Sequence, residues 1–166
     1  MWTLHNRCSV ARRKDGWFQD PKAVEIYNAI DYDFEKSFGK GESSHAIRAT
    51  VFDEAIKEFW KESPNGTVVN FAEGLETQRF RLQECMAEDA LWISIDLPDG
   101  MAAREKFIQP DEKHLHLGVS VLNVGAWMSL VPRDKPVFFT AQGLFAYLEE
   151  DENKYLFQQM AEHFPG

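Results

Sequence analysis

The chain has few cysteines, and they are poorly placed to form a disulfide or bind a metal. Cys8 and Cys85 lie far apart and form neither a CxxC pair nor a cluster with histidine. This spacing argues against a disulfide scaffold and against a zinc site. His114 and His116 alternate along one expected strand, but no third ligand accompanies them, so we expect no bound metal.

Long apolar runs are also missing from the sequence. No run approaches the roughly 18 residues that would suggest a membrane span. Residues 1–10 lack the apolar stretch of a signal peptide. We therefore expect a cytoplasmic protein without a membrane partner.

Basic residues are outnumbered by acidic ones, 18 to 27, which gives a formal net charge of −9. Such a surface repels nucleic acid on average, so we expect no nucleic-acid partner and favour a small-molecule ligand. Residues 1–20 nevertheless combine Arg7, Arg12, Arg13 and Lys14 with aromatic side chains. In so acidic a chain this group is more typical of a solvated surface, or of a cap that pairs with anions, than of a nucleic-acid arm.

The 166 residues fit a single domain, in which we expect a helical cap over residues 1–64 and a sheet over 65–166. Asp20-Pro21 predicts the start of a helix, because proline suits the first helical turn. Apolar residues from Ile47 to Trp60, Val51 among them, recur at three- and four-residue spacing and predict a second helix with these side chains as its buried stripe. Between them, Gly39-Lys40-Gly41 lacks the GxxxxGK spacing of a phosphate cradle, and we interpret it as a mobile loop.

Four apolar runs follow at regular intervals and predict strands. They are Thr67 to Phe71, Leu91 to Ile95, Leu115 to Val121 and Pro136 to Thr140. Helical stretches around residues 76–87 and 98–107 separate the first three runs, so the pattern predicts an α/β fold with parallel strands. A ligand should then lie at the carboxyl ends of the strands. The acidic run at residues 149–152 predicts the start of a final helix.

The first run ends in the turn Ala72-Glu73-Gly74, and the second is followed by Asp96, 22 residues after Gly74. This arrangement is typical of a nucleoside site, since the turn lets the backbone approach the ligand and the carboxylate accepts hydrogen bonds from ribose hydroxyls. The paired glycines of a pyrophosphate site are missing. A nicotinamide dinucleotide oxidoreductase is therefore a poorly supported alternative.

Short motifs along nearly the whole chain carry a family resemblance. They are Leu4-His5-Asn6-Arg7, Asp20-Pro21, Arg48 with Phe52-Asp53, Asn70 to Gln78, Asp96-Leu97-Pro98, Ala126-Trp127-Met128, Thr140 to Leu144 with Tyr147, and Phe164-Pro165-Gly166. Together they resemble the leucine carboxyl methyltransferase superfamily, and more narrowly its tetracenomycin-type O-methyltransferases of polyketide biosynthesis. The resemblance implies a class I, Rossmann-like fold with strand order 3-2-1-4. It also implies S-adenosylmethionine as cofactor, S-adenosylhomocysteine as product and no metal.

The same resemblance assigns roles to particular residues. Arg7 and Arg48 would hold the methionyl carboxylate, a task suited to guanidinium groups. The remaining assignments place Ala72, Glu73 and Gly74 under the methionine and ribose, Asp96 with Leu97 at the ribose, Ser120, Val121 and Leu122 beside the adenine, and Gln142 with Tyr147 near the sulfonium and the acceptor. Tyr147 is the candidate catalytic residue, first of all for positioning.

The implied reaction is methyl transfer to a carboxylate or hydroxyl of a small, polyketide-like acceptor. Ala72 stands where the family usually has glycine, and Glu73 replaces a small residue. Family members also continue with further strands, so we expect a truncated sheet with an open fourth strand, across which two copies could pair. The alternative function is a non-catalytic domain that acts through self-association or through cofactor binding alone.

Overall fold

The computed structural model describes residues 1–14 and 16–164, and these fall into two compact units. The first comprises Met1–Glu58 and Leu75–Met86, and the second Phe59–Gly74 and Ala87–Gly166. Of the matched motif Phe164-Pro165-Gly166, the last two residues lie outside the described part.

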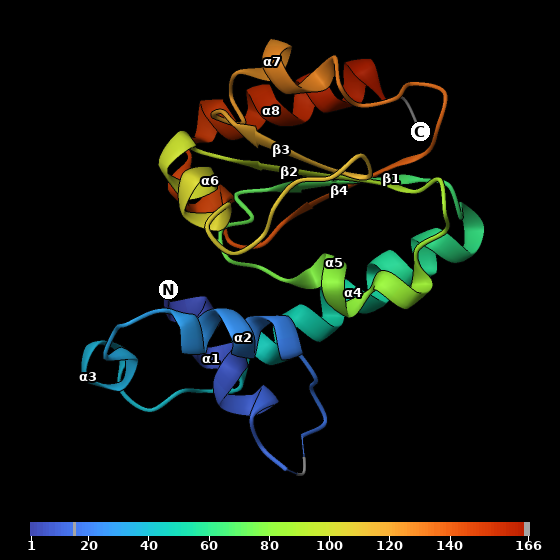
Figure 1. Cartoon of the computed structure of the whole chain (residues 1–166). Coiled ribbons are helices and arrows are strands. Elements are labelled where there is room, and N and C mark those ends of the chain that lie inside the picture. The colour runs from blue at the N-terminus through green and yellow to red at the C-terminus, as the bar shows by residue number, and fades with distance from the viewer. Residues whose placement is uncertain (15, 165–166) are drawn as a thin grey trace. The chain divides into compact units, whose positions relative to one another are not determined.

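The first unit is helical (Figure 1). Its elements are α1 (Trp2–Ala11), α2 (Pro21–Ala29), α3 (Phe34–Phe38), most of α4 (Ser44–Glu62), α5 (Gln78–Arg81) and the 3-10 turn η1 (Gln83–Cys85). Asp20 caps α2 by accepting a hydrogen bond from the Ala23 amide at 3.0 Å, at the helix start that Asp20-Pro21 predicted. The long helix expected around residues 76–87 is reduced to α5 and η1, and the sequence pattern did not predict α1 or α3.

Helix α4 forms where the periodicity predicted it, but its buried side differs from the expected stripe. Ile47 and Val51 are 52% and 62% exposed, whereas Ala46, Ala49 and Ile56 are fully buried. A stripe chosen from the large apolar residues was therefore wrong in the first turns. Small side chains occupy the buried side there, and Ala46 and Ala49 pack in one core cluster.

The second unit contains the sheet (Figure 1). Its strands are β1 (Thr67–Phe71), β2 (Leu91–Asp96), β3 (His114–Gly118) and β4 (Val137–Ala141), and its helices are α6 (Pro98–Arg104), α7 (Val124–Met128), the 3-10 turn η2 (Phe145–Tyr147) and α8 (Glu150–His163). All pairings are parallel and the order is β3-β2-β1-β4. The predicted α/β fold and strand order are therefore confirmed. Strand β3 ends at Gly118, before the expected end at Val121, and Val121 belongs to the apolar core cluster.

The two faces of the sheet differ in chemistry because alternate residues of a strand point to opposite sides. Val69, Phe71 and Ile93 belong to the apolar face, which packs with Trp127 of α7 and Leu156 of α8. Figure 1 shows both helices on that side of the sheet. Asn70, Ser94 and Thr140 lie in register on neighbouring strands of the other, more polar face.

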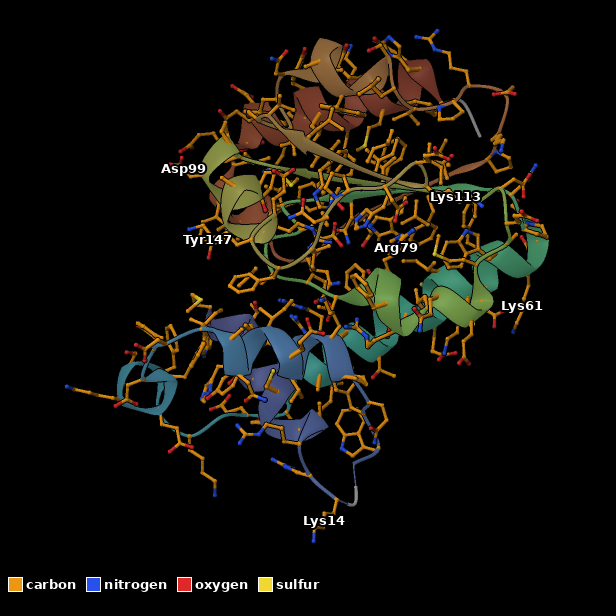
Figure 2. The ribbon with its side chains drawn as sticks, in the orientation of Figure 1. Lys14, Lys61, Arg79, Asp99, Lys113 and Tyr147 are labelled. Carbon is orange, nitrogen blue, oxygen red and sulfur yellow. The ribbon has the colours of Figure 1, made fainter. Side chains whose placement is uncertain are left out.

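Some charged side chains lie at the surface, and others cap a helix. Lys14, Lys61 and Asp99 project outward (Figure 2). Glu149 and Glu152 form a capping box at the start of α8, as the acidic run predicted. None of the described helices combines the length and apolar character needed to cross a membrane.

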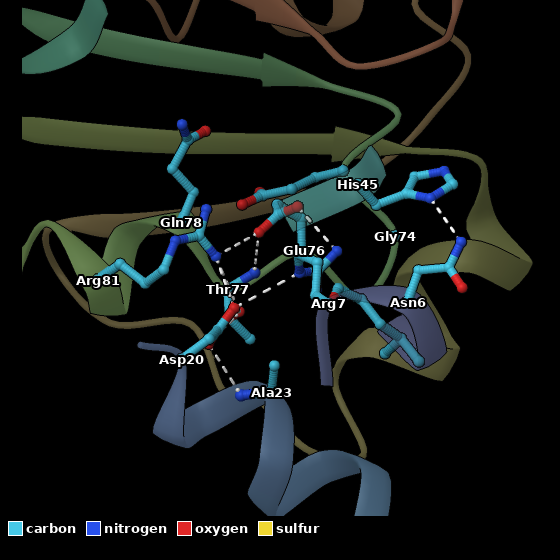
Figure 3. Close-up of polar contacts among 12 residues, drawn as sticks. Asn6, Arg7, Asp20, Ala23, His45, Gly74, Glu76, Thr77, Gln78 and Arg81 are labelled. Atoms are coloured by element: carbon cyan, nitrogen blue, oxygen red, sulfur yellow. Dashed lines mark hydrogen bonds and ion pairs between the residues drawn. The ribbon is translucent and has the colours of Figure 1, made fainter. Parts of the chain in front are cut away.

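An ion cluster fills the interior of the first unit (Figure 3). Arg81 Nη1 lies 2.7 Å from both Asp20 Oδ2 and Glu76 Oε1, and Arg81 Nε lies 2.7 Å from Asp53 Oδ2. Arg7 Nη1 lies 2.9 Å from Glu76 Oε2. All of these side chains are almost completely buried, so removing one partner would leave an uncompensated charge.

Arg7 and Arg81 hold the Glu76 carboxylate in its charged form. Burial by itself raises its pKa, but attraction by Arg7 and Arg81 and hydrogen bonds from Arg81 and the Thr77 amide lower the pKa to about 2. For Asp53, burial outweighs the hydrogen bonds and attraction of Arg81 and raises the pKa. One guanidinium faces Asp53, whereas two face Glu76.

Acid should therefore destabilise the wild-type protein partly through Glu76. Its folded pKa lies below the usual value of 4.5, so its contribution is present above about pH 5 and is lost as the pH falls towards about 2. We expect Glu76 to account for about 3 kcal/mol of that loss. Urea unfolding from pH 7 to pH 2 should show a shallower decline for Glu76→Gln than for the wild type.

Glu25→Gln supplies the matched control, because Glu25 is 65% exposed in its pair with Lys22. It should leave the acid decline unchanged, since an exposed pair contributes little. The raised pKa of Asp53 favours the folded state as the pH falls, which is the opposite of the effect of Glu76. Asp53 is present in the wild type and in both variants, so it does not affect their comparison. Equal acid declines in Glu76→Gln and the wild type would contradict the assignment.

Candidate functional site

The turn after β1 brings the backbone close to the end of β2. Ala72 and Gly74 both have φ of 52°, in the left-handed region. The Ala72 amide donates to the Ile95 carbonyl at 2.8 Å, which ties the turn to β2. A residue with a side chain is strained there by about 1–2 kcal/mol. This strain gives a physical reason for the glycine that the resemblance led us to expect at position 72.

Asp96 joins the turn to the end of β2 through its carboxylate. Its Oδ2 accepts from the Gly74 amide at 2.6 Å, and its Oδ1 accepts from the Leu97 amide at 2.7 Å. The side chain is only partly buried. A carboxylate has about four acceptor positions, so capacity remains for a ligand hydroxyl.

Arg104 of α6 holds the same turn from within the second unit. Its Nη1 donates to the Gly74 carbonyl at 2.8 Å, and its Nη2 lies 3.1 Å from Glu73 Oε1. Both side chains of the pair are fully buried. Glu73 is thus an internal ion-pair partner, and its predicted place under the methionine and ribose of the cofactor stays a prediction. The sequence analysis missed Arg104, whose only signal was a cation in the helix after Asp96-Leu97-Pro98.

A cavity of about 270 Å³ opens beside this turn and beyond the carboxyl ends of β2 and β3. Six of the predicted site residues line it, namely Ala72, Asp96, Leu97, Ser120, Val121 and Tyr147. The structure adds Val119, Leu144 and Leu148 to the lining. These apolar residues come shortly after the ends of β3 and β4 in the sequence. Their position after a strand is the sequence signal by which they could have been predicted. Apart from Asp96 and the hydroxyls of Ser120 and Tyr147, the side chains of the lining are apolar.

Four predicted residues of this unit lie outside that lining, namely Glu73 and Gly74 of the turn, Leu122 and Gln142. Leu122 packs against the apolar core, and its amide donates to Ser120 Oγ at 3.2 Å. Gln142 follows β4 directly, and both polar atoms of its amide are buried without a hydrogen-bond partner among the described residues. An unpaired buried polar group costs about 1–3 kcal/mol. The Gln142 amide therefore has the properties expected of a group that awaits a ligand.

Tyr147 lies at the rim of the cavity and is 87% exposed (Figure 2). Its backbone amide donates to the Leu144 carbonyl at 2.9 Å, which fixes the 3-10 turn. Within residues 1–14 and 16–164 its hydroxyl has no partner that would activate it as a base. This environment suits a positioning residue better than a proton acceptor.

The two predicted arginines belong to the first unit. Arg7 is 1% exposed, and besides the carboxylates of the ion cluster its Nη2 contacts the Leu75 carbonyl at 2.8 Å (Figure 3). Its guanidinium is thus engaged by the protein. Arg48 is partly buried, and its Nε has no hydrogen-bond partner in the described part of the chain. The cofactor roles of both stay predictions.

His114 and His116 lie on the polar face of the sheet and contact each other. Their Nε2 atoms are 3.2 Å apart, and Ser94 Oγ lies 2.8 Å from His114 Nε2. Burial lowers the pKa of His116, and Arg104 lowers it further. The described residues contain no group of three or more side chains suited to a metal ion.

The fold and this site fit a known family. The family model described as leucine carboxyl methyltransferase matches residues 6–161, and the chain belongs to this family. The resemblance found in the motifs is thereby confirmed. Its members are S-adenosylmethionine-dependent methyltransferases, in agreement with the predicted cofactor.

Two relatives match the chain along almost its whole length. The tetracenomycin polyketide synthesis O-methyltransferase TcmP of Streptomyces glaucescens is 28% identical over 165 residues, which cover 98% of this chain and 60% of the relative. The S-adenosyl-L-methionine-dependent methyltransferase dpfgK of Gibberella zeae is 27% identical over 177 aligned positions, with 98% and 59% covered. The chain thus spans about 60% of the length of the curated relatives it matches.

A glycine in α6 should be essential to the position of Asp96. A Cβ built on Gly100 would lie 2.6 Å from Asp96 Oδ1, whereas one on Gly125 of α7 would meet nothing within 4 Å. We expect Gly100→Ala to destabilise the protein by about 1–3 kcal/mol, because the displaced carboxylate would lose its amide partners.

Gly125→Ala is the matched control, since it makes the same change in another helix. It should stabilise the protein by about 0.5–1 kcal/mol through helix propensity. Guanidinium unfolding measures both variants. Equal stabilities would mean that the Asp96 carboxylate is not held as described.

Proposed function

We propose that the protein is an S-adenosylmethionine-dependent O-methyltransferase that acts on a small, polyketide-like acceptor. The observation that carries the proposal is the Asp96 carboxylate, which joins the strained Ala72–Gly74 turn to a mostly apolar cavity at the carboxyl end of the sheet. Family membership supports the cofactor. The name of TcmP supports an oxygen acceptor from polyketide synthesis.

The cavity has the chemistry of a nucleoside site. Asp96 offers free acceptor capacity for ribose hydroxyls, and Val119, Val121 and Leu144 offer apolar walls to a flat base. Its volume of about 270 Å³ lies just below the usual range of ligand pockets, about 300–1,000 Å³. We infer that it accommodates the nucleoside part of the cofactor and leaves little room for an acceptor as well.

Further parts of the cofactor require polar partners beyond this lining. The buried, unpaired amide of Gln142 is a suitable donor in the described part of the second unit. Gln142 is therefore the best-supported candidate of that unit for the methionyl part.

The reaction asks mainly for alignment and exclusion of water. When bound, S-adenosylmethionine supplies a methyl group activated by its sulfonium. Leu97, Val121 and Leu148 would exclude water, and Tyr147 at the rim would orient the acceptor. Because Asp96 and Tyr147 are the sole ionisable side chains of the described lining, we favour a carboxylate acceptor, which needs no general base at neutral pH.

The proposal predicts a ligand effect at Asp96. Asp96→Asn should weaken S-adenosylhomocysteine binding by about tenfold to a hundredfold, because a hydrogen bond to a charged group contributes about 1.5–3 kcal/mol. Asp99→Asn removes an exposed carboxylate three residues later and should leave the affinity unchanged (Figure 2). Titration calorimetry with S-adenosylhomocysteine measures both, and thermal unfolding without ligand monitors folding.

A nicotinamide dinucleotide serves as the second titrant. Tighter binding of the dinucleotide would favour the oxidoreductase alternative over the methyltransferase. Unchanged S-adenosylhomocysteine affinity in Asp96→Asn would refute the ribose role of this carboxylate.

A second candidate function is cofactor binding or self-association without catalysis. It is favoured by the modest cavity and by β4, which pairs with β1 and with no other strand of the described residues. An unprotected edge strand offers its free backbone groups to another chain. We propose that two copies pair along this edge.

This pairing predicts a dimer at micromolar concentration. Multi-angle light scattering should give about twice the 19.2 kDa of one chain. A single species with the mass of one chain across that concentration range would rule the pairing out.

A further inference from the structure

A second cavity, of about 400 Å³, lies within the first unit among α1, α2, α3 and the loop that follows α3. None of the residues predicted to hold the cofactor lines it. Its lining includes Lys40 and Gly41. They belong to the loop that lacks the GxxxxGK spacing of a phosphate cradle. The predicted cofactor residues therefore do not account for this cavity.

The charge of this cavity opposes that of the chain. Arg12, Arg13 and Lys40 line it, with Glu35 as the one carboxylate of the described lining. The whole chain carries a net charge of −9. None of the three cations forms an ion pair with a carboxylate in the described residues, so their charges are available to a ligand.

The two arginines are oriented by uncharged neighbours. The Arg12 guanidinium lies over the Tyr27 ring, 5.5 Å from its centroid. Arg13 Nε donates to the Ser9 carbonyl at 3.2 Å. Both contacts leave the terminal guanidinium nitrogens without a partner among residues 1–14 and 16–164. Guanidinium groups placed in this way can bind an anion with two hydrogen bonds each.

The wall between the arginines and Lys40 is closely packed. His5 is buried, with Nε2 3.0 Å from the Gly39 carbonyl and Nδ1 3.3 Å from the Tyr27 hydroxyl. A Cβ built on Gly41 would lie 2.4 Å from the Ser9 Cβ, so the loop packs directly on α1. This packing holds Lys40 beside the helix that carries the arginines.

We propose that this cavity binds a small anion that carries phosphate or carboxylate groups. The helix dipole explains why cations are favourable at the end of α1. It does not explain Lys40, which comes from a different segment and adds a third positive charge to the same cavity. Three cations around one cavity match a di- or trianion, and the hydroxyl of Tyr27 provides a further polar contact. The site is independent of the proposed methyl transfer.

Titration calorimetry of the full chain at low salt, without cofactor, tests this site with inorganic phosphate and citrate as probes. Arg12→Ala/Arg13→Ala should weaken binding of the better probe by at least about tenfold. Lys61→Ala/Lys106→Ala removes the same charge from exposed positions outside the cavity and should change affinity by less than about twofold. Lys40→Glu, which reverses one exposed charge, should weaken binding as strongly as the arginine pair.

The two probes distinguish phosphate from carboxylate recognition, and circular dichroism confirms that each variant folds. Equal losses in the arginine and lysine double variants would overturn the site in favour of diffuse attraction. No binding of either probe at about 10 mM would also overturn it. If a short single-stranded DNA oligonucleotide bound more tightly than either probe, the ligand of this cavity would be a nucleic acid and not a small anion.

Discussion

The Asp96 carboxylate is the contact on which the candidate site depends. It accepts hydrogen bonds from two backbone amides, Gly74 at the turn after β1 and Leu97 at the start of α6. Parallel strands end at one edge of a sheet, so one short side chain can bridge two neighbouring strand ends. The bridge fixes the entrance of the cavity and still leaves acceptor capacity for a ligand.

The strain in the turn is compatible with this role because other contacts maintain it. Ala72 adopts a left-handed conformation that costs about 1–2 kcal/mol. The Ile95 carbonyl and the buried Arg104–Glu73 pair oppose any relaxation of the turn. Local strain at a ligand site persists when the surrounding structure determines it from several sides. Ala72 thus adopts, at an energetic cost, a conformation that glycine adopts freely.

Several parts of the fold followed from local sequence patterns. Apolar runs predicted β1, β2 and β4 closely, and Asp20-Pro21 and the acidic run at 149–152 marked the starts of α2 and α8. Such signals are local, since strand runs and helix caps depend on a few neighbouring residues. The short helices α3 and α7 were missed because their five residues each are too few to show a helical period. The stripe of α4 was wrong at Ile47 and Val51 because burial depends on partners distant in sequence.

By itself the sequence determined the α/β class, the parallel order and the family, because periodic apolar runs and ordered motifs are properties of the linear chain. It also identified six residues that line the cavity, including Asp96 and Tyr147. Only the tertiary structure decided that Glu73 is neutralised by Arg104, that Arg7 belongs to a buried ion cluster, and that Arg12, Arg13 and Lys40 share a cavity. The physical reason is that a charged side chain acquires its role from the partners that folding places beside it, and those partners come from distant segments of the chain.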